Sequence, residues 1–100
     1  MKTISIIVPT YNEEENVAPM AQTITTIFEN DLCNYNLELI FIDNLSKDNT
    51  RNILRNLCME DQRIKCIFNA KNFGPFNSPY YGITQSTGDC TILLCADFQD

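Results

Sequence analysis

Three short segments of the chain concentrate side chains of the kinds that bind metal ions and phosphorylated ligands. They supply an aromatic ring, carboxylates and amides, and no Lys or Arg stands beside the predicted strand ends to offset the charge of Asp43, Asp97 and Asp100. Oxygen ligands of this type suit Mg²⁺ or Mn²⁺, and a divalent ion would in turn favour a diphosphate ligand. The segments are Pro9-Thr10-Tyr11-Asn12-Glu13, Asp43-Asn44-Leu45-Ser46 and Ala96-Asp97-Phe98-Gln99-Asp100.

Each segment taken alone also fits an ordinary turn, helix cap or acidic loop, because the same residue types dominate turns. Other kinds of site are excluded by what the sequence lacks. No G-x-G-x-x-G follows the first predicted strand and no G-x-x-x-x-G-K-[ST] is present, which argues against a dinucleotide site and a P-loop. The chain has no His, so it contains no His-dependent catalytic triad.

Short apolar runs and longer polar stretches alternate along the chain. The runs are rich in β-branched or aromatic residues with little alternation, which is typical of strands buried on both faces; they span 4–8, 37–42, 64–68 and 90–94. The pattern predicts an α/β fold, β-α-β-α-β-α-β, with a parallel sheet built from right-handed crossovers. Ligands of such sheets bind beyond the carboxyl ends of the strands, where the three polar segments fall.

Three helices are expected between these strands. The first has a continuous apolar stripe, formed by Val17, Met20, Ala21, Ile24, Ile27 and Phe28. Asn12 and Glu15 resemble a capping box at its start. A shorter stripe from Ile53 to Cys58 follows a polar cluster in which Ser46 or Asp48 can cap the second helix. The third helix is predicted to begin at Ser78 and to stop at Gly88.

Composition indicates an ordinary soluble domain. The 100 residues are 44% hydrophobic and carry a net charge of −6, so the composition lacks the excess of positive charge that is typical of nucleic-acid-binding proteins. No apolar run approaches the roughly 18 residues of a membrane span, and the start of the chain lacks a signal-peptide core. The five cysteines form no C-x-x-C pair, so we expect buried free thiols in a reducing cytoplasm rather than a disulfide framework.

Five motifs in register resemble the N-terminal half of a family 2 glycosyltransferase with the GT-A fold. Nearly the whole chain takes part, and the likeness is strongest to the branch that uses polyprenyl- or dolichyl-phosphate acceptors. The motifs are Ser5 to Glu14 (SIIVPTYNEE), Ile42 to Thr50 (IDNLSKDNT), Asn72-Phe73-Gly74, Thr87-Gly88-Asp89 and Ala96 to Asp100 (ADFQD). The resemblance implies a Rossmann-like, nucleotide-diphospho-sugar transferase fold, truncated at residue 100.

The resemblance also implies roles for individual residues. Tyr11 is placed to stack on the base, and Asp43 matches a carboxylate that hydrogen-bonds the base or ribose. Asp97 matches the last Asp of a D-x-D motif that holds Mg²⁺ or Mn²⁺ against the donor diphosphate, assisted by Gln99. The full nucleotide-sugar-binding set implied is Pro9, Thr10, Tyr11, Asn12, Glu13, Asp43, Ala96 and Asp97, with Asp97 and Gln99 as metal ligands.

Two departures from the family pattern concern the metal and the nucleotide. Cys95 stands where the first Asp of D-x-D is usual, and a thiol is a poor ligand for a hard cation, so a plain buried residue is the preferred interpretation. The usual Asp-Asp-Gly-Ser turn is Asp43-Asn44-Leu45-Ser46, which leaves nucleotide choice open. The general base that an inverting transferase needs is expected beyond Asp100, so residues 1–100 are interpreted as a single donor-binding part without a complete active site.

The resulting hypothesis is a metal-dependent, inverting glycosyltransferase that moves a sugar from a nucleotide-diphosphate donor to a lipid-phosphate or envelope-glycan acceptor. Expected partners are that donor and acceptor, without nucleic acid. The expected location is the cytoplasm, at the inner face of the cell membrane, with membrane association through later segments and a homo-oligomer left open. The alternatives are a non-catalytic nucleotide-binding or interaction module of the same fold, and an unrelated flavodoxin-like domain.

Overall fold

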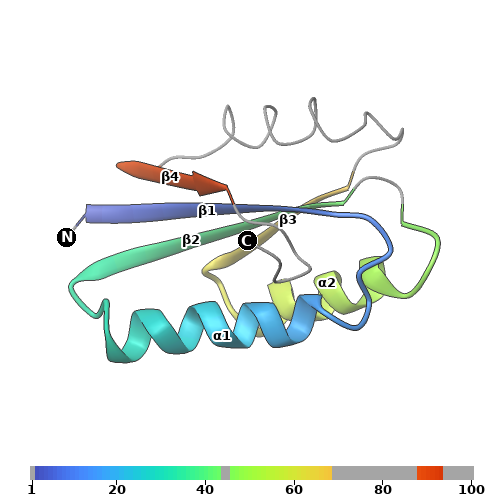
Figure 1. Cartoon of the computed structure of the whole chain (residues 1–100), viewed down its shortest axis with the longest axis horizontal. Helices are drawn as coiled ribbons and strands as arrows, with labels where there is room; N and C mark the ends of the chain where they lie inside the picture. Colours follow the sequence, from blue (N-terminus) through green and yellow to red (C-terminus); the bar gives the residue numbers. More distant parts are fainter. Residues whose placement is uncertain (1, 44–45, 69–87, 94–100) are drawn as a thin grey trace.

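A computed structural model describes residues 2–43, 46–68 and 88–93. Within these ranges the elements follow one another as predicted, with two βα units leading into a third strand (Figure 1). Their bounds are β1 Lys2–Thr10, α1 Val17–Asn30, β2 Tyr35–Asp43, α2 Thr50–Glu60, β3 Ile64–Phe68 and β4 Cys90–Leu93. The predicted third helix, at 78–88, lies outside the described residues apart from Gly88.

The four strands form one parallel sheet in the order β3-β2-β1-β4. The α/β fold with a parallel sheet is therefore confirmed. Register places Thr10 of β1 opposite Asp43 of β2, and Asp43 opposite Phe68 of β3. The carboxyl ends of three strands thus meet in one row, which we call the carboxyl edge. Both helices lie on one face of the sheet, and their leading loops share this end of it (Figure 1).

β1 and β2 extend beyond their predicted bounds at both ends. β1 continues through Pro9 and Thr10, and β2 includes Asp43, so these residues are strand positions rather than loop positions. Pro9 is compatible with a strand here because pairing with β4 spans only Ile4 to Ile7, and the missing N–H of Pro9 falls beyond it. The additional strand residues carry polar side chains right up to the edge of the sheet.

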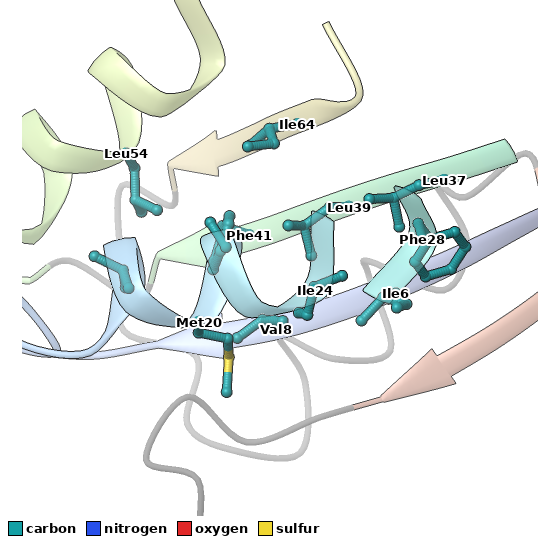
Figure 2. Packing of buried hydrophobic residues seen from close by; sticks show 12 residues of the cluster. Ile6, Val8, Met20, Ile24, Phe28, Leu37, Leu39, Phe41, Leu54 and Ile64 are labelled. Carbon is teal, nitrogen blue, oxygen red and sulfur yellow. The ribbon is translucent and has the colours of Figure 1, made fainter. Parts of the chain in front are cut away.

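The main core lies between the sheet and the two helices (Figure 2). Val17, Met20, Ala21, Ile24 and Phe28 of α1 are buried against β1 and β2, as the stripe predicts. Ile27 belongs to the predicted stripe but is 41% exposed, because its position lies at the margin of the helix face that meets the sheet.

The opposite face of the sheet carries a second buried cluster of Ile7, Ile40 and Ile42. β1 and β2 are therefore buried on both faces, as their sequences predict. The same expectation is wrong for β4, whose four residues are all exposed, since it pairs with β1 alone in the described sheet.

The predicted cap is absent from α1, whereas one of the two predicted capping residues bonds to the first residue of α2. The N-cap of α1 is Asn16, without a side-chain cap, so the capping box of Asn12 and Glu15 is absent. In α2 the N-cap is Asn49, and Asp48 accepts a hydrogen bond from the backbone N–H of Thr50 at 2.9 Å. Asp48 is one of the two predicted capping residues, whereas Ser46 bonds elsewhere. Asn12 and Ser46 are both used in contacts between loops.

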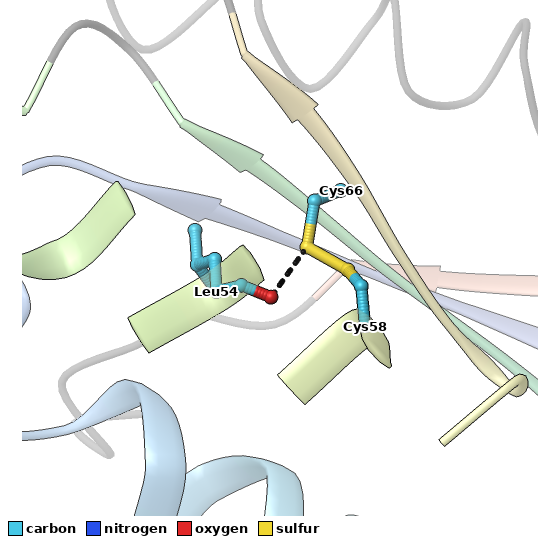
Figure 3. The surroundings of a disulfide bond; sticks show 3 residues. All are labelled: Leu54, Cys58 and Cys66. Carbon is cyan, nitrogen blue, oxygen red and sulfur yellow. Dashed lines mark hydrogen bonds between the residues drawn. A yellow bond between two sulfur atoms is a disulfide. The ribbon is translucent and has the colours of Figure 1, made fainter. Parts of the chain in front are cut away.

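The cysteines differ most from expectation. Cys58 of α2 and Cys66 of β3 form a disulfide, so the prediction of free thiols is wrong for this pair (Figure 3). The helix and strand are adjacent, and the Sγ of Cys66 also lies 3.3 Å from the carbonyl oxygen of Leu54. Cys33 and Cys90 are free as predicted but exposed rather than buried. Cys95 lies outside the described residues.

Neither helix in the described ranges is long and apolar enough to span a membrane.

Candidate functional site

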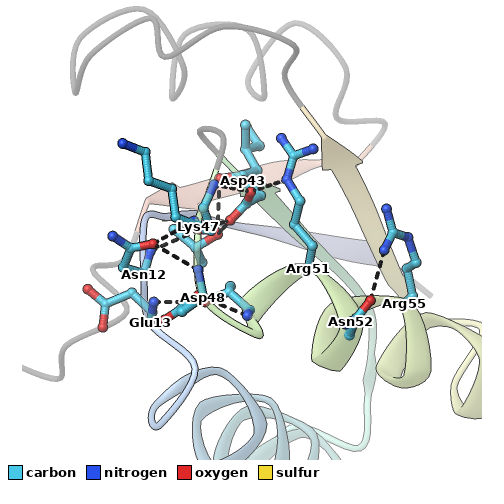
Figure 4. Close-up of polar contacts among 12 residues, drawn as sticks. Asn12, Glu13, Asp43, Lys47, Asp48, Arg51, Asn52 and Arg55 are labelled. Carbon is cyan, nitrogen blue, oxygen red and sulfur yellow. Dashed lines mark hydrogen bonds and ion pairs between the residues drawn. The ribbon is translucent and has the colours of Figure 1, made fainter.

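Asp43 is the centre of the carboxyl edge. Its side chain is fully buried, and both of its oxygens accept hydrogen bonds from protein donors. Oδ1 accepts from the hydroxyls of Thr10, at 3.0 Å, and Ser46; Oδ2 accepts from the backbone N–H of Ser46 at 2.9 Å. The Nε of Arg51 donates to Oδ2 as well, at 2.7 Å (Figure 4). The carboxylate therefore joins β1, β2 and the first turn of α2.

Arg51 corrects the electrostatic prediction made from the sequence. No cation is expected beside the strand ends, yet Arg51 forms an ion pair with Asp43 and its own side chain is 23% exposed. Its guanidinium carbon also lies 5.4 Å from the ring centroid of Phe68, and that of Arg55 lies 4.9 Å from the same centroid. Two cations thus pack on the aromatic residue that ends β3. Part of the negative charge at this edge is neutralised from within the chain.

The β1–α1 and β2–α2 loops are fastened together by a set of hydrogen bonds that we call the loop clasp. Consecutive backbone N–H groups of the first loop each donate to a side chain of the second. Asn12 donates to the Ser46 hydroxyl at 2.9 Å, Glu13 to the Thr50 hydroxyl at 2.9 Å and Glu14 to Asp48 Oδ2 at 3.3 Å. Two hydrogen bonds run in the opposite direction, from the second loop to the first: Asn12 Oδ1 accepts from the N–H of Lys47 at 2.8 Å and from that of Asp48 at 3.4 Å (Figure 4).

Hydrogen bonds from Thr50 and Glu14 lower the pKa of Asp48. Burial alone would raise the pKa of this carboxyl, but hydrogen bonds from the hydroxyl and N–H of Thr50 and from the N–H of Glu14 together bring it below its ordinary value of 3.8. These donors favour the ionised form, because a protonated carboxyl accepts them less well. Asp48 is therefore an anion that holds the start of α2 and the first loop together.

The predicted nucleotide-binding residues fall into two groups. Thr10 and Asp43 are buried and bond to each other, and Pro9 is half-buried within β1. Tyr11 and Asn12 are exposed at the tip of the first loop, with 43% of Tyr11 accessible. Glu13 is half-buried, and its Oε2 accepts from Asn16 Nδ2 at 2.9 Å. Tyr11 is therefore the aromatic surface that this loop presents.

The predicted metal ligands Asp97 and Gln99, together with Ala96 and Asp100, lie outside the described residues. In the ranges that the structure describes, no three acidic or Cys side chains come together as a metal-binding group. Asp43 does not fit a metal ion, since its oxygens are occupied and Arg51 lies against it. The described residues thus supply the protein scaffold of this edge, and a metal site would depend on the last predicted segment.

Sequence reasoning missed Arg51, Phe68 and Thr50. A signal for Phe68 was available, because it is the last residue of a predicted strand and so lies at the carboxyl edge. Arg51 was less visible: it comes eight residues after Asp43, and only the observed start of α2 turns it back toward the strand end. Thr50 looks like an ordinary first-turn residue, yet it is fully buried under the first loop.

The chain is similar to a known protein family and to several curated proteins. The family model described as "Glycosyl transferase family 2" matches residues 5–100. The chain is 34% identical over 97 residues to the prophage bactoprenol glucosyl transferase homolog of Escherichia coli K12, and 34% identical over 96 residues to the uncharacterized glycosyltransferase YkcC of Bacillus subtilis. These matches cover 97% and 96% of the chain but 31% and 29% of the two relatives. The chain therefore spans about a third of their length.

Solved structures are similar at the level of the fold. S. aureus TarS 1-349 in complex with UDP superposes with a TM-score of 0.77 at 24% identity, over 97% of this chain and 28% of that one. The mannosyltransferase PcManGT from Pyrobaculum calidifontis, in complex with GDP-Man and Mn²⁺, superposes with a TM-score of 0.74 at 21% identity. This match covers 94% of this chain and 27% of that one.

Proposed function

This chain belongs to glycosyltransferase family 2 and has the GT-A fold, and we propose that it forms the nucleotide-sugar-binding part of a glycosyltransferase domain. The observation that carries the proposal is the loop clasp at the carboxyl edge, where parallel α/β sheets bind their ligands. It presents the ring of Tyr11 from a backbone that is already ordered, which reduces the entropic cost of binding a planar base.

The roles proposed for individual residues differ along this edge. Tyr11 stacks on the base, while Pro9 and Glu13 shape the surface around it. The family resemblance implies that Asp43 bonds the base or ribose, and such a contact would have to displace one of its protein donors. Thr10 and Asp43 therefore stabilise the ends of β1 and β2 beneath the first loop, and the nucleotide lies over that loop.

The proposal extends to the donor diphosphate. Its charge would be held by Mg²⁺ or Mn²⁺ bound through Asp97 and Gln99, beside Ala96. PcManGT, which shares this fold, was solved in complex with GDP-Man and Mn²⁺, and that complex supports divalent metal use. When bound, such an ion offsets the charge that develops on the departing nucleoside diphosphate.

The names of the relatives support a lipid-linked acceptor, because several are bactoprenol glucosyl transferases. We therefore propose a hexosyl transfer with inversion, from a nucleotide-diphospho-sugar to a polyprenyl-phosphate or an envelope glycan. The proposed place of the reaction is the cytoplasmic face of the cell membrane. The general base and the acceptor site belong to later segments of the domain.

Isothermal titration of the full-length protein with UDP, GDP and their sugars, each with and without Mn²⁺, tests the proposal. We expect saturable binding of one nucleotide series that tightens with Mn²⁺ and weakens about fivefold or more in Tyr11→Ala, since a base–aromatic stack contributes about 1–3 kcal/mol. Asn30→Ala, at the far end of α1, is the control. Binding that is independent of Mn²⁺ and unaccompanied by sugar transfer would favour the non-catalytic module instead.

A further inference from the structure

Asn12 has the most unusual backbone conformation among the non-glycine residues that the structure describes. Its φ is +53°, and no other non-glycine residue in those ranges has a positive φ. A side chain in this left-handed region is disfavoured by contact between Cβ and the following carbonyl oxygen, and Asn tolerates it better than most residues. The chain therefore makes a sharp bend directly after Tyr11, at a residue that is exposed rather than enclosed by the core.

The side chain of Asn12 compensates for that bend. Its Oδ1 accepts from two successive backbone N–H groups, those of Lys47 and Asp48, while its own N–H donates to the Ser46 hydroxyl. Two backbone donors can only face the carboxamide oxygen, so the orientation of the amide group is fixed by its partners. Three contacts thus converge on one residue and tie the bend to the β2–α2 loop just before α2.

We infer that Asn12 is a positioning residue that sets Tyr11 for the nucleotide, and that it does not itself contact the ligand. The inference rests on the proposed function. The carboxamide oxygen accepts from Lys47 and Asp48 and is therefore already used, and Asn12→Asp, which replaces only the amide nitrogen, tests whether that nitrogen contacts the ligand. Tyr11 lies between this bend and the buried end of β1, where Thr10 bonds to Asp43. The backbone of Tyr11 is consequently anchored on both sides, although its ring is exposed.

A series of variants separates the two contributions of Asn12. Asn12→Gly keeps access to positive φ but removes the carboxamide oxygen. Asn12→Ala loses both the oxygen and the ease of the bend. Asn12→Asp keeps an acceptor and tolerates the bend, but it adds a negative charge near an anionic ligand. Measurements in about 0.5 M NaCl, where the screening length is about 4 Å, reduce that charge effect.

The experiment measures UDP and GDP binding to the full-length protein by calorimetry, together with hydrogen exchange of the Lys47 and Asp48 amides. Loosening the first loop lowers the fraction of molecules that are ready to bind and weakens the apparent affinity in proportion. We expect binding to weaken by about tenfold or more in Asn12→Ala and by several-fold in Asn12→Gly. The nucleotide affinity of Asn12→Asp should lie within about threefold of the wild-type affinity.

The exchange data report the clasp independently of any ligand. Both amides should exchange at least about tenfold faster in Asn12→Ala and Asn12→Gly but not in Asn12→Asp or the control Asn30→Ala. Wild-type affinity in Asn12→Ala, or unchanged amide exchange, would overturn the positioning role. An equal loss of nucleotide affinity in all three Asn12 variants would also overturn the positioning role, since that result indicates direct contact between the carboxamide and the ligand. If the wild type binds neither nucleotide, the proposed function fails, whereas the exchange result still decides whether Asn12 holds the loop.

Discussion

The ion pair of Asp43 and Arg51 is predicted to be the strongest energetic coupling at the carboxyl edge. Asp43 is fully buried and Arg51 is 23% exposed, so removing either partner leaves a charge that water cannot fully solvate. Breaking a buried pair typically costs about 3–5 kcal/mol. Because water reaches Arg51 in part, we expect about 2–3 kcal/mol of lost stability for Arg51→Ala and about 3–4 kcal/mol for Asp43→Ala.

The double variant should lose less than the sum of the single losses. Once Asp43 is gone, removing Arg51 no longer breaks this ion pair, so we expect a total loss of about 4 kcal/mol and a coupling energy of about 1–3 kcal/mol. Urea unfolding followed by circular dichroism gives the four free energies of unfolding that the cycle requires.

Arg55→Ala is the matched control for this cycle. Arg55 packs on Phe68 at 4.9 Å, as Arg51 does at 5.4 Å, but its guanidinium donates a hydrogen bond to Asn52 rather than to Asp43. Its removal should cost only about 0.5–1 kcal/mol and should add to the effect of Asp43→Ala without coupling. If Arg51 and Asp43 were also additive to within about 0.5 kcal/mol, the ion pair would not stabilise this edge and the reasoning would be refuted.

Three further predictions concern the sheet, the clasp and the disulfide. Gly88→Ala should lower the free energy of unfolding by about 1–3 kcal/mol, because a Cβ there would lie 2.2 Å from the hydroxyl oxygen of Ser5. Adding Ser5→Ala should not restore stability fully, since the Cβ would still lie 2.9 Å from the backbone nitrogen of residue 5. Full restoration by the second substitution would contradict this backbone contact. The lowered pKa of Asp48 stabilises the fold above pH 3.8, and this contribution should vanish as the pH falls through the lower, folded-state value. Acid unfolding of Asp48→Asn should therefore be less steep than that of wild type, and an identical pH profile would contradict the assignment. Reducing the bond between Cys58 and Cys66, which are eight residues apart, should cost about 2.5 kcal/mol by the loop-entropy relation; thiol titration before and after reduction should show a gain of two thiols, and no gain would exclude the disulfide.

Local sequence patterns predicted the elements well because burial of apolar runs decides them. The runs at 4–8, 37–42 and 64–68 became strands, and the α1 stripe packs as expected apart from Ile27. The same local reasoning failed at Asn12, where the Asn-x-x-Glu pattern suggested a helix cap. Donors on the second loop compete for its carboxamide, and they are more than thirty residues away in sequence.

The charge balance of the edge could not be inferred from neighbours in sequence either. Arg51 reaches Asp43 only because α2 begins at Thr50 and turns the side chain back over β2. The disulfide has the same origin: a turn between α2 and β3 brings Cys58 and Cys66 together, and their spacing alone matches no pairing rule. Contacts of this kind depend on where a helix begins and how it is rotated on the sheet.

The central claim is that this carboxyl edge binds the nucleotide of a sugar donor. Its most direct test is calorimetric titration of the full-length protein with UDP-sugars and GDP-sugars in the presence and absence of Mn²⁺. We predict saturable, Mn²⁺-dependent binding of one series, which Tyr11→Ala weakens about fivefold or more while Asn30→Ala leaves it unchanged. Absence of binding to either series, or binding that is indifferent to Tyr11, would contradict the claim.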